Sequence, residues 1–583
     1  MNFVAAPLYA VSTSVLLAIA LAFLRGGLDL TGARLALDGG LLVAALALWQ
    51  GRNERIVRRA PGPWEWAAIG VFALVSARAF LWLVFVDGDA IKVLSPNNLG
   101  DLALHITYIR NLAGGAPFWP ENPIFAHGAL TYPVGMDLFN ALLAIVGVDV
   151  LRGFIWVGLA GAALAGAALW KWGRGMALAA FLGNGGLAGF AVLVTWTLVD
   201  FQADIAWKSF FLSIFVTQRG MLFALPAALL LLASWRTRFF AAGEDGWRLP
   251  LCGELLLYAS MPVFHLHTFI FLSLMLGSWF VLQAPARAAL LRLVGLAFVP
   301  ATVLTMLVTD RMRGASVIGW KPGWMWDDTT WVEWCKANLP GVAELNARLL
   351  FWPVNFGVLI LLVAWLGWRL ANDARAVWQR ALFFPALFIF LLCCFVKFAP
   401  WEWDNTKIMI WSYLAIVPLA WQELLAARPL WMRAGAAVLL FGSGFVSLFG
   451  GIDGKYRGFD LALRSELDGV AKAVRTIPPA ERFTAYPTFN HPLLLVGRKV
   501  ALGYPGHAWS HGLDYRPVEA RVDALMNGGD GWRDHARELG VRYLFWGTRE
   551  AENYKNSREP WKSEATVIAS GDWGTIYDLT SPP

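Results

Sequence analysis

Long apolar runs alternate with short polar segments along the chain as far as about residue 450. A membrane-spanning helix needs about 20 mainly apolar residues, and the shortest need about 17. This criterion predicts about thirteen spans and an α-helical, polytopic membrane protein. The runs lie near residues 4–24, 35–50, 64–86, 153–170, 175–199, 220–234, 249–264, 267–284, 293–309, 350–368, 381–396, 408–424 and 433–449. The first run has no basic stretch before it and no clean cleavage site, so we expect a retained span rather than a signal peptide.

Basic residues in the short connecting segments predict the orientation, because cytoplasmic loops are enriched in Lys and Arg. The segment 51–59, with four Arg, places the loop after the second span in the cytoplasm. The apolar stretch 136–149 is short, and counting it as a span would invert every later loop, so we interpret it as an interfacial helix. The expected outer segments are 87–152, 200–219, 310–349, 397–407 and everything after 450.

The tail, residues 451–583, differs in character from the rest of the chain. It is polar and rich in turns, and it combines an amphipathic helix ("LRSELDGVAKAVRTI") with short strand-like runs ("RFTAYP", "LLLVGRKVAL", "VRYLFWG" and "GTIYDL"). Strands that alternate with helices predict a small α/β domain. More than a hundred residues are enough for such a domain to bury a core of its own.

Composition supports the membrane assignment and narrows the class of ligand. The chain is 58% hydrophobic and 15% charged, whereas soluble domains have about 25% charged residues. The net charge of +7 does not indicate nucleic-acid binding, because cytoplasmic loops of any polytopic protein carry Arg. The 32 Trp either lie at bilayer interfaces or partly line a site for a flat, hydroxyl-rich or lipid ligand. The four Cys imply no disulfide framework.

Polar residues of mixed chemistry gather on the expected outer side. Such residues at a membrane edge are costly and tend to mark function. The set comprises Asp101, His105, Gln218, Arg219, His265, His267, Arg311, Lys397, Asp404 and Lys407. Basic residues in cytoplasmic loops are routine, but acids, imidazoles and cations together on the outer side are not.

Two of these groups also admit purely structural explanations. Asp101 and His105 lie four residues apart, so in a helix they share a face, where they either act together or cap and solvate a loop helix. His265 and His267 either mark the turn between two helices or bind a metal ion, although no third ligand is evident. A rival acidic pair, Asp87 and Asp89, follows the third span as "DGD". It is either a solvated helix end or a motif that holds a metal and a nucleotide diphosphate.

The segment "KFAPWEWDNTKIMIW", residues 397–411, is the densest polar stretch between two spans. It places Glu402, Asp404 and Asn405 between two Lys and among Trp side chains. Lys suits phosphate oxygens as a point charge and Arg as a planar fork. Four cations are therefore candidates for binding a phosphate at the membrane surface: Arg219, Arg311, Lys397 and Lys407. The alternative is that these side chains anchor helix ends at the interface.

The segment "GDLALHITYIRNLAGGAPFWPENPIFAHGALTYPVGMDLF" resembles the first outer loop of GT-C glycosyltransferases, polytopic enzymes that take sugars from polyprenyl-phosphate carriers. It is most similar to a poorly characterised bacterial branch of that superfamily. The resemblance continues in "TQRGMLFALP", "MPVFHLHTFI", residues 397–411 and residues 489–517. It implies a GT-C-like catalytic part in 64–450 with its first outer loop at 87–152, two extra helices in 1–63, and a periplasmic α/β domain in 451–583.

The resemblance also implies roles for residues. Asp101 matches the family's catalytic Asp, a general base that takes the acceptor hydroxyl proton so that transfer inverts the sugar's configuration. His105 would orient this carboxylate or bind a sugar hydroxyl, and the four cations would hold the donor phosphate. The remaining candidates would bind the sugar or the acceptor: Glu402, Trp403, Asp404, Asn405, His265, His267, Gln218 and Trp119. The tail segment "GHAWSHGLDY" would shape the acceptor or lid side rather than take part in the chemistry.

The implied partners are a polyprenyl-phosphate-sugar donor and a glycan, lipid or protein acceptor, at the periplasmic face of a bacterial inner membrane. Some members of the superfamily use a divalent cation such as Mg or Mn, and the sequence leaves this open. An oligosaccharide ligase or polymerase with a larger lipid-linked donor is an alternative, because it would use similar residues. A flippase or transporter would place ionisable residues at mid-membrane in broken helices, often with inverted repeats. We see neither pattern.

Overall fold

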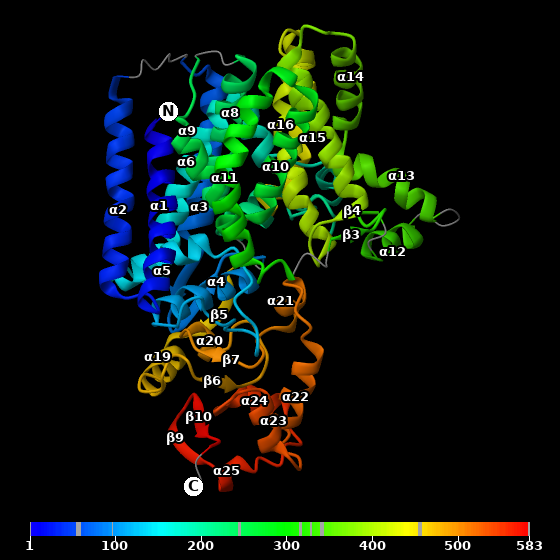
Figure 1. Cartoon of the computed structure of the whole chain (residues 1–583). Helices are drawn as coiled ribbons and strands as arrows, with labels where there is room; N and C mark the ends of the chain where they lie inside the picture. Colours follow the sequence, from blue (N-terminus) through cyan, green and yellow to red (C-terminus); the bar gives the residue numbers. More distant parts are fainter. Residues whose placement is uncertain are drawn as a thin grey trace.

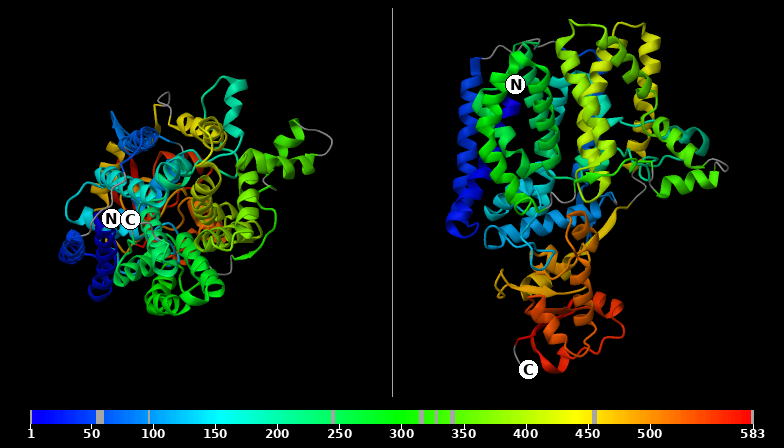
Figure 2. Two further views of the ribbon diagram at one scale, coloured as in Figure 1. Left: turned by 90° about the horizontal axis from the view of Figure 1, so that it is seen from above. Right: turned by 45° about the vertical axis from the view of Figure 1, so that its right-hand side comes forward.

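The computed structural model describes residues 2–53, 60–95, 97–242, 246–313, 318–326, 329–338, 343–452 and 457–580. A bundle of long helices forms one part of the molecule, and the tail lies beyond one end of it (Figures 1 and 2). The long helices are α1 Asn2–Arg25, α2 Leu30–Gln50, α3 Pro63–Leu81, α6 Val150–Leu182, α8 Met221–Phe240, α11 Arg287–Val308, α15 Val377–Phe395 and α16 Thr406–Ala420. A last span joins α17 Leu430–Ala437, η8 Val438–Gly442 and α18 Ser443–Gly451.

Shorter elements complete the membrane part. They are α4 Asn97–Ala113, α5 Gly135–Ile145, α9 Leu251–Phe264, α10 Leu266–Leu282, α12 Thr329–Asn338, α13 Ala343–Phe356, α14 Leu359–Ala371, and the strands β3 Gly319–Trp320 and β4 Val396–Lys397. Within the described residues, nine helices are long and apolar enough to cross a membrane, and the bent pair α13–α14, with an angle of 81°, would make a tenth. The predicted number of thirteen is therefore not confirmed. The stretch 136–149, interpreted as an interfacial helix, forms the 11-residue α5.

One predicted span is not a continuous helix. The run 175–199 begins after a kink in α6 at Gly173 and Arg174 and is helical as far as Leu182. It then continues only as the short segments η2 Ala188–Ala191 and α7 Val192–Thr195. The reason lies in the glycines that follow. A Cβ at Gly186 would lie 2.3 Å from the carbonyl oxygen of Val354, and a Cβ at Gly189 would lie 2.1 Å from that of Ser443. The chain here packs backbone against backbone, which only glycine permits.

The basic connecting segments gather at the end of the bundle away from the tail (Figure 1). There Arg174 pairs with Glu65 at 2.7 Å, and Arg369 pairs with Glu423 at 3.1 Å. Of the expected outer segments, 87–152 lies at the opposite end, beside the tail, whereas α12 and α13 of 310–349 project from the side of the bundle (Figure 1). The charge asymmetry between the two ends thus follows the predicted topology, although residues 54–59 of the basic loop lie outside the described residues. That the tail end faces the periplasm remains a prediction.

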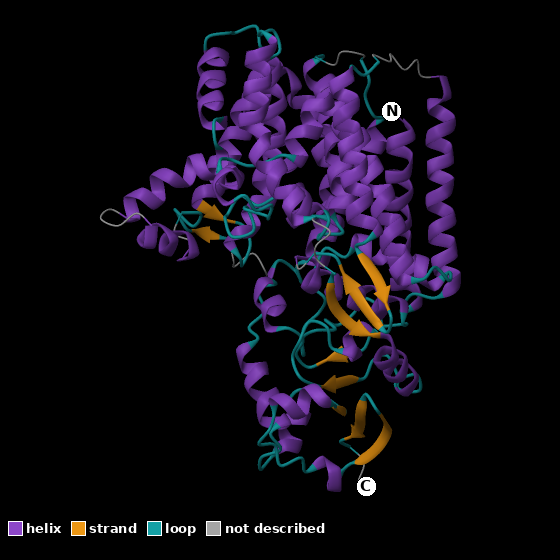
Figure 3. Ribbon diagram, turned by 180° about the vertical axis from the view of Figure 1, so that it is seen from behind, coloured by secondary structure: helices purple, strands orange, loops and turns teal. Residues whose placement is uncertain are grey.

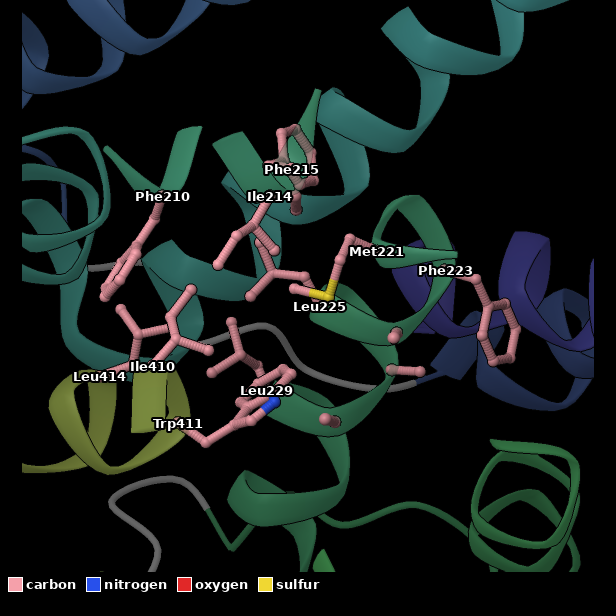
Figure 4. Packing of buried hydrophobic residues seen from close by; sticks show 14 of the residues in the cluster. Phe210, Ile214, Phe215, Met221, Phe223, Leu225, Leu229, Ile410, Trp411 and Leu414 are labelled. Atoms are coloured by element: carbon pink, nitrogen blue, oxygen red, sulfur yellow. The ribbon is translucent and has the colours of Figure 1, made fainter. Parts of the chain in front are cut away.

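Helix α8 forms the centre of the bundle, and most of its side chains are buried. Its Leu225 and Leu229 lie near Ile410 and Trp411 of α16 (Figure 4). Helices in a membrane associate through close packing, which small residues allow. In α6, a Cβ at Gly161 would lie 2.7 Å from Leu222 of α8, so this glycine lets the two helices approach.

The first outer loop and the tail share a sheet. The hairpin β1 Val84–Asp87 and β2 Ala90–Val93 pairs antiparallel with β5 Phe459–Leu463 of the tail. The "DGD" acids are therefore at a hairpin turn and not at a helix end, since α3 stops at Leu81. Asp87 pairs with Lys92 at 2.7 Å, and Asp89 accepts a hydrogen bond from the backbone N–H of Ser465 at 3.0 Å. Asp87 thus stabilises the hairpin itself, and Asp89 joins the hairpin to the tail.

The rest of the tail is a mixed five-stranded sheet in the order β7-β6-β8-β10-β9, flanked by helices (Figure 3). Its strands are β6 Arg482–Thr484, β7 Lys499–Val500, β8 Tyr543–Trp546, β9 Thr566–Gly571 and β10 Gly574–Asp578. Its helices are α19 Arg464–Ala473, α20 Pro492–Leu495, α21 Pro505–Ser510, α22 Arg516–Met526, α23 Trp532–Glu538, α24 Thr548–Asn553 and α25 Trp561–Glu564. The predicted α/β character is confirmed. The start of the strand-like run "LLLVGRKVAL" is instead the short helix α20, because Pro492 begins a turn that His491 caps.

The tail buries much of its core against the first outer loop. Leu104 and Tyr108 of α4 and Ile124 of the loop pack in one cluster with Val470 and Phe483 of the tail. The backbone N–H of Ala126 also donates to the carbonyl oxygen of Ala501 at 2.8 Å. The tail is thereby held directly over the loop that carries Asp101.

Candidate functional site

A cavity of about 760 Å³ lies where the outer helix ends meet the tail. Its wall comes from the α9–α10 junction, the end of α11, the loop 125–133, the segment 398–407 and the tail residues 510–514. Gly220 makes this arrangement possible, because a Cβ there would lie 2.0 Å from the carbonyl oxygen of Phe264. The start of α8 can therefore pack tightly against the α9–α10 junction.

Five of the predicted site residues lie in the wall of this cavity: Gln218, His265, His267, Asp404 and Lys407. The Lys407 ammonium pairs with Asp404 at 2.8 Å, and both side chains are largely buried. The positive charge of Lys407 also acts on both histidines. Residues separated by almost 200 positions in the sequence thus form one polar wall at the bundle end.

His265 occupies the extended residue between α9 and α10 and caps the start of α10. Its Nδ1 accepts a hydrogen bond from the backbone N–H of Thr268 at 3.2 Å. Its Nε2 is buried and has no partner among the described residues. His265 and His267 therefore do mark a turn, as one of the two explanations predicted. The described residues contain no group of three or more His, Cys, Asp or Glu side chains that could hold a metal ion.

Asp101 lies beside the cavity, in the first turns of α4. Its carboxylate is partly buried, and no described residue hydrogen-bonds it. Burial raises the pKa of this carboxyl, opposed by the nearby charges of His105 and Lys407. Asp404 also acts on it, so the carboxylate belongs to the same charged group as the cavity wall. An acid in this position is a free proton acceptor close to a fixed cation.

His105, one turn further along α4, has a partner that the sequence reasoning missed. Its Nδ1 lies 2.8 Å from Oδ1 of Asp137 in α5, and the two side chains are 2% and 1% exposed. A carboxylate at Nδ1 fixes the orientation of an imidazole ring and leaves Nε2 directed elsewhere. The signal was present in the sequence, because Asp137 is an acid in the otherwise apolar "GMDLF".

The structure places Arg219 inside packed protein and not in the cavity wall. It is 1% exposed, donates to the carbonyl oxygen of Phe154 at 3.1 Å and lies over the Phe154 ring. Its charge acts on Asp137, the partner of His105. Burial lowers the pKa of Arg219 to about 10, so the guanidinium still carries its charge.

Three further predicted residues lie outside the cavity wall. Arg311 is exposed just after the end of α11. Lys397 belongs to β4, where it pairs in register with Gly319, and Glu402 forms an ion pair with Lys321. Lys397 and Glu402 therefore lie at the neighbouring β3–β4 surface. Arg311 lies next to the cavity, because Asp310 and Met312 on either side of it belong to the cavity wall.

The remaining predicted residues hold the loops in place. Asn405 is fully buried and donates to the carbonyl oxygens of Cys393 and Val396 at 2.8 and 2.7 Å. The indole N–H of Trp403 donates to Ala206 at 2.9 Å, and that of Trp119 donates to Leu130 at 2.8 Å. The structural explanation therefore fits these three side chains, whose polar groups already have partners within the protein.

The tail places two histidines at the site. His511 lies in the cavity wall, with its ring 5.1 Å from that of Tyr132, which in turn lies 6.0 Å from that of His105. His507 stacks 6.5 Å from His511 and packs on Gly100, next to Asp101. Burial lowers the pKa of His507 to about 4 and that of His511 to about 3. Both rings are therefore neutral near pH 7. In the sequence, the only signal for these two site histidines was their spacing in "GHAWSH".

The chain matches no protein-family model and no curated protein. Solved structures of an oligosaccharyltransferase from Archaeoglobus fulgidus do resemble it. The apo form has a TM-score of 0.47 and 13% identity, over 86% of this chain and 73% of that one. A form tethered to an acceptor peptide has a TM-score of 0.46 and 11% identity. A complex with an inhibitory peptide and a dolichol-phosphate has a TM-score of 0.46 and 12% identity. Both matches cover 89% of this chain and 74% of the other. At this identity and TM-score the likeness assigns no role to any residue of this chain.

Proposed function

We propose that this protein is a membrane glycosyltransferase that moves a sugar from a polyprenyl-phosphate-linked donor to an acceptor hydroxyl. The observation that carries the proposal is the uncommitted, partly buried carboxylate of Asp101. It lies beside a cavity whose wall contains the paired cation Lys407. An oligosaccharide ligase that uses a larger lipid-linked donor would use the same groups and is the second candidate.

The cavity suits a ligand with an apolar chain and a polar head. Its apolar wall comes from the membrane-facing helix ends and includes Phe264, Phe269, Ile270 and Val308. Its polar wall comes from the histidines, Asp404 and Lys407 and from the tail. A lipid-linked sugar has these two parts, and its reactive bond lies between them.

In the proposed reaction, Asp101 accepts the proton of the acceptor hydroxyl as its oxygen attacks the anomeric carbon. The bond between that carbon and the phosphate oxygen breaks, and the polyprenyl phosphate leaves from the opposite face, so the configuration inverts. The Lys407 ammonium stabilises the charge that develops on the leaving phosphate. Asp404 positions this ammonium, and the raised pKa of Asp101 makes its carboxylate a stronger base.

A flippase fits the structure less well. Its ionisable residues would lie at mid-membrane. Asp404 instead lies just before α16 and Lys407 lies in the first turn of that helix, in a cavity wall to which tail residues 510–514 also contribute. We further propose that the tail end of the bundle faces the periplasm of a bacterial inner membrane, as the distribution of basic residues indicates.

The experiment uses the purified full-length chain in liposomes with polyprenyl-phosphate-linked hexoses and pentoses, labelled in the sugar. We expect release of polyprenyl phosphate together with a labelled product. Parallel reactions with EDTA, Mg or Mn determine metal dependence. Movement of intact sugar-lipid between leaflets without cleavage would support the flippase and contradict the proposal. Donors with a single sugar and with an oligosaccharide separate the two transferase candidates.

The pH dependence of transfer should follow Asp101. A general base must be ionised, so kcat is expected to fall as the pH decreases through the pKa of this carboxyl. Because burial raises that pKa, the fall should be centred above the ordinary value of 3.8. The measurement is kcat between pH 4 and 8 at saturating donor, and a profile that is flat down to pH 4 would exclude Asp101 as the base.

A further inference from the structure

Two imidazole nitrogens of the cavity wall have no partner among the described residues. They are Nε2 of His265, from the α9–α10 junction, and Nδ1 of His511, from the tail. A buried polar atom without a partner costs about 1–3 kcal/mol, so protein interiors rarely contain one without a reason. The described residues contain other such atoms, among them Nδ1 of His535, but the His265 and His511 nitrogens belong to residues of one cavity wall. A ligand bound there could supply hydrogen bonds to both.

The neutral imidazoles restrict the chemistry of that ligand. Burial lowers the pKa of His265, so its ring is neutral near pH 7. Because Nδ1 accepts the Thr268 N–H, the neutral ring carries its proton on Nε2, a donor without a partner among the described residues. A neutral His511 ring offers one acceptor nitrogen and one donor nitrogen. A phosphate only accepts hydrogen bonds, whereas a sugar hydroxyl both donates and accepts.

The wall therefore has separate places for charge and for hydroxyl groups. Lys407, paired with Asp404, and Arg313, paired with Asp310, supply the positive charge of the wall. Lys407 acts electrostatically on both His265 and His511. The two imidazoles are thus near the cation but are themselves suited to an uncharged polar group.

We propose that His265 and His511 together bind hydroxyl groups of the transferred sugar, so that the tail contributes a direct ligand contact to the site. This inference rests on the proposed function and extends it. It changes the sequence-based expectation that the tail only shapes the acceptor or lid side. Tyr132, whose ring lies 5.1 Å from that of His511, positions the imidazole and connects it with His105.

The test compares full-length His511→Ala and His265→Ala with His535→Ala, a control in the tail outside the cavity wall. Each cavity variant is expected to raise the donor KM about tenfold, the loss that one hydrogen bond explains, with a smaller change in kcat. The control should leave both constants unchanged. His511→Gln is a second variant in case His511→Ala folds poorly. Its amide keeps a hydrogen-bond donor and acceptor, so its donor KM should lie between those of the wild type and His511→Ala.

Donors that lack single hydroxyl groups make the test specific. For the wild type, the donor that lacks the hydroxyl bound by His511 should have a KM about tenfold higher than the complete donor. For His511→Ala, the same donor should show little further increase in KM, because the contact is already absent. An unchanged KM in His511→Ala, or full additivity at every deoxy position, would overturn the inference. The proposed function is tested independently by Asp101→Asn. If this variant is inactive, the proposed function stands even when the inference about His265 and His511 fails. Full activity in Asp101→Asn would contradict the proposed function.

Discussion

Replacing Asp101 by Asn is expected to lower kcat for sugar transfer about 10²–10⁴-fold, the usual contribution of a general base. Asn has nearly the same shape but cannot accept the proton. Since no described residue hydrogen-bonds the Asp101 carboxylate, its removal should not disturb the fold. The measurement is transfer by the purified variant in liposomes, together with its thermal unfolding midpoint. The variant should also lose the acid limb of the pH profile.

Asp89→Asn is the matched control for this experiment. Asp89 is also an outer-side carboxylate, but it accepts hydrogen bonds from Ser465 and joins the hairpin to the tail. Its replacement should leave kcat within about twofold of the wild type, because a change of 0.4 kcal/mol or less is typical for an exposed contact away from the site. Full activity in Asp101→Asn with loss in Asp89→Asn would move the base to the hairpin.

Replacing Asp137 by Ala should affect both stability and activity. The substitution leaves the buried Nδ1 of His105 without its partner at 2.8 Å, and a lost buried partner costs about 1–3 kcal/mol. It also removes the negative charge of Asp137 that acts on the buried Arg219. We expect a lower unfolding midpoint and a reduced kcat, because His105 is no longer held in one orientation beside Asp101.

Asp137→Asn and Asp530→Ala separate these two effects. Asn retains a hydrogen-bonding group of the same size, so this variant should be more stable than Asp137→Ala but still reduced in kcat. Asp530 is fully exposed in the tail and pairs with Arg558 at the surface, so its replacement should change neither quantity. Equal kcat in Asp137→Ala and the wild type would show that the pair with His105 is only structural.

The membrane part was largely predictable because it depends on local sequence. Apolar runs identify helices without knowledge of their neighbours, and basic residues distinguish the two ends of the bundle. The predicted span at 175–199 was wrong because Gly186 and Gly189 pack against the backbone of Val354 and Ser443, which are far away in the sequence. In the tail, alternation of strands and helices predicted the class of fold but not the pairing of β5 with β2.

The sequence by itself determined that acids, imidazoles and cations lie together at one end of a helical bundle. Only the tertiary structure decided which of them share a cavity. It places Lys407 and His265 in the cavity wall, together with His511 of the tail. Asn405 instead hydrogen-bonds to backbone carbonyl oxygens, Arg219 is buried in the interior, and Asp137 pairs with His105. The physical reason is that a polar side chain at a helix end can satisfy its hydrogen bonds within the protein or leave them open to a ligand. That choice depends on neighbours distant in the sequence, which hydropathy and spacing do not encode.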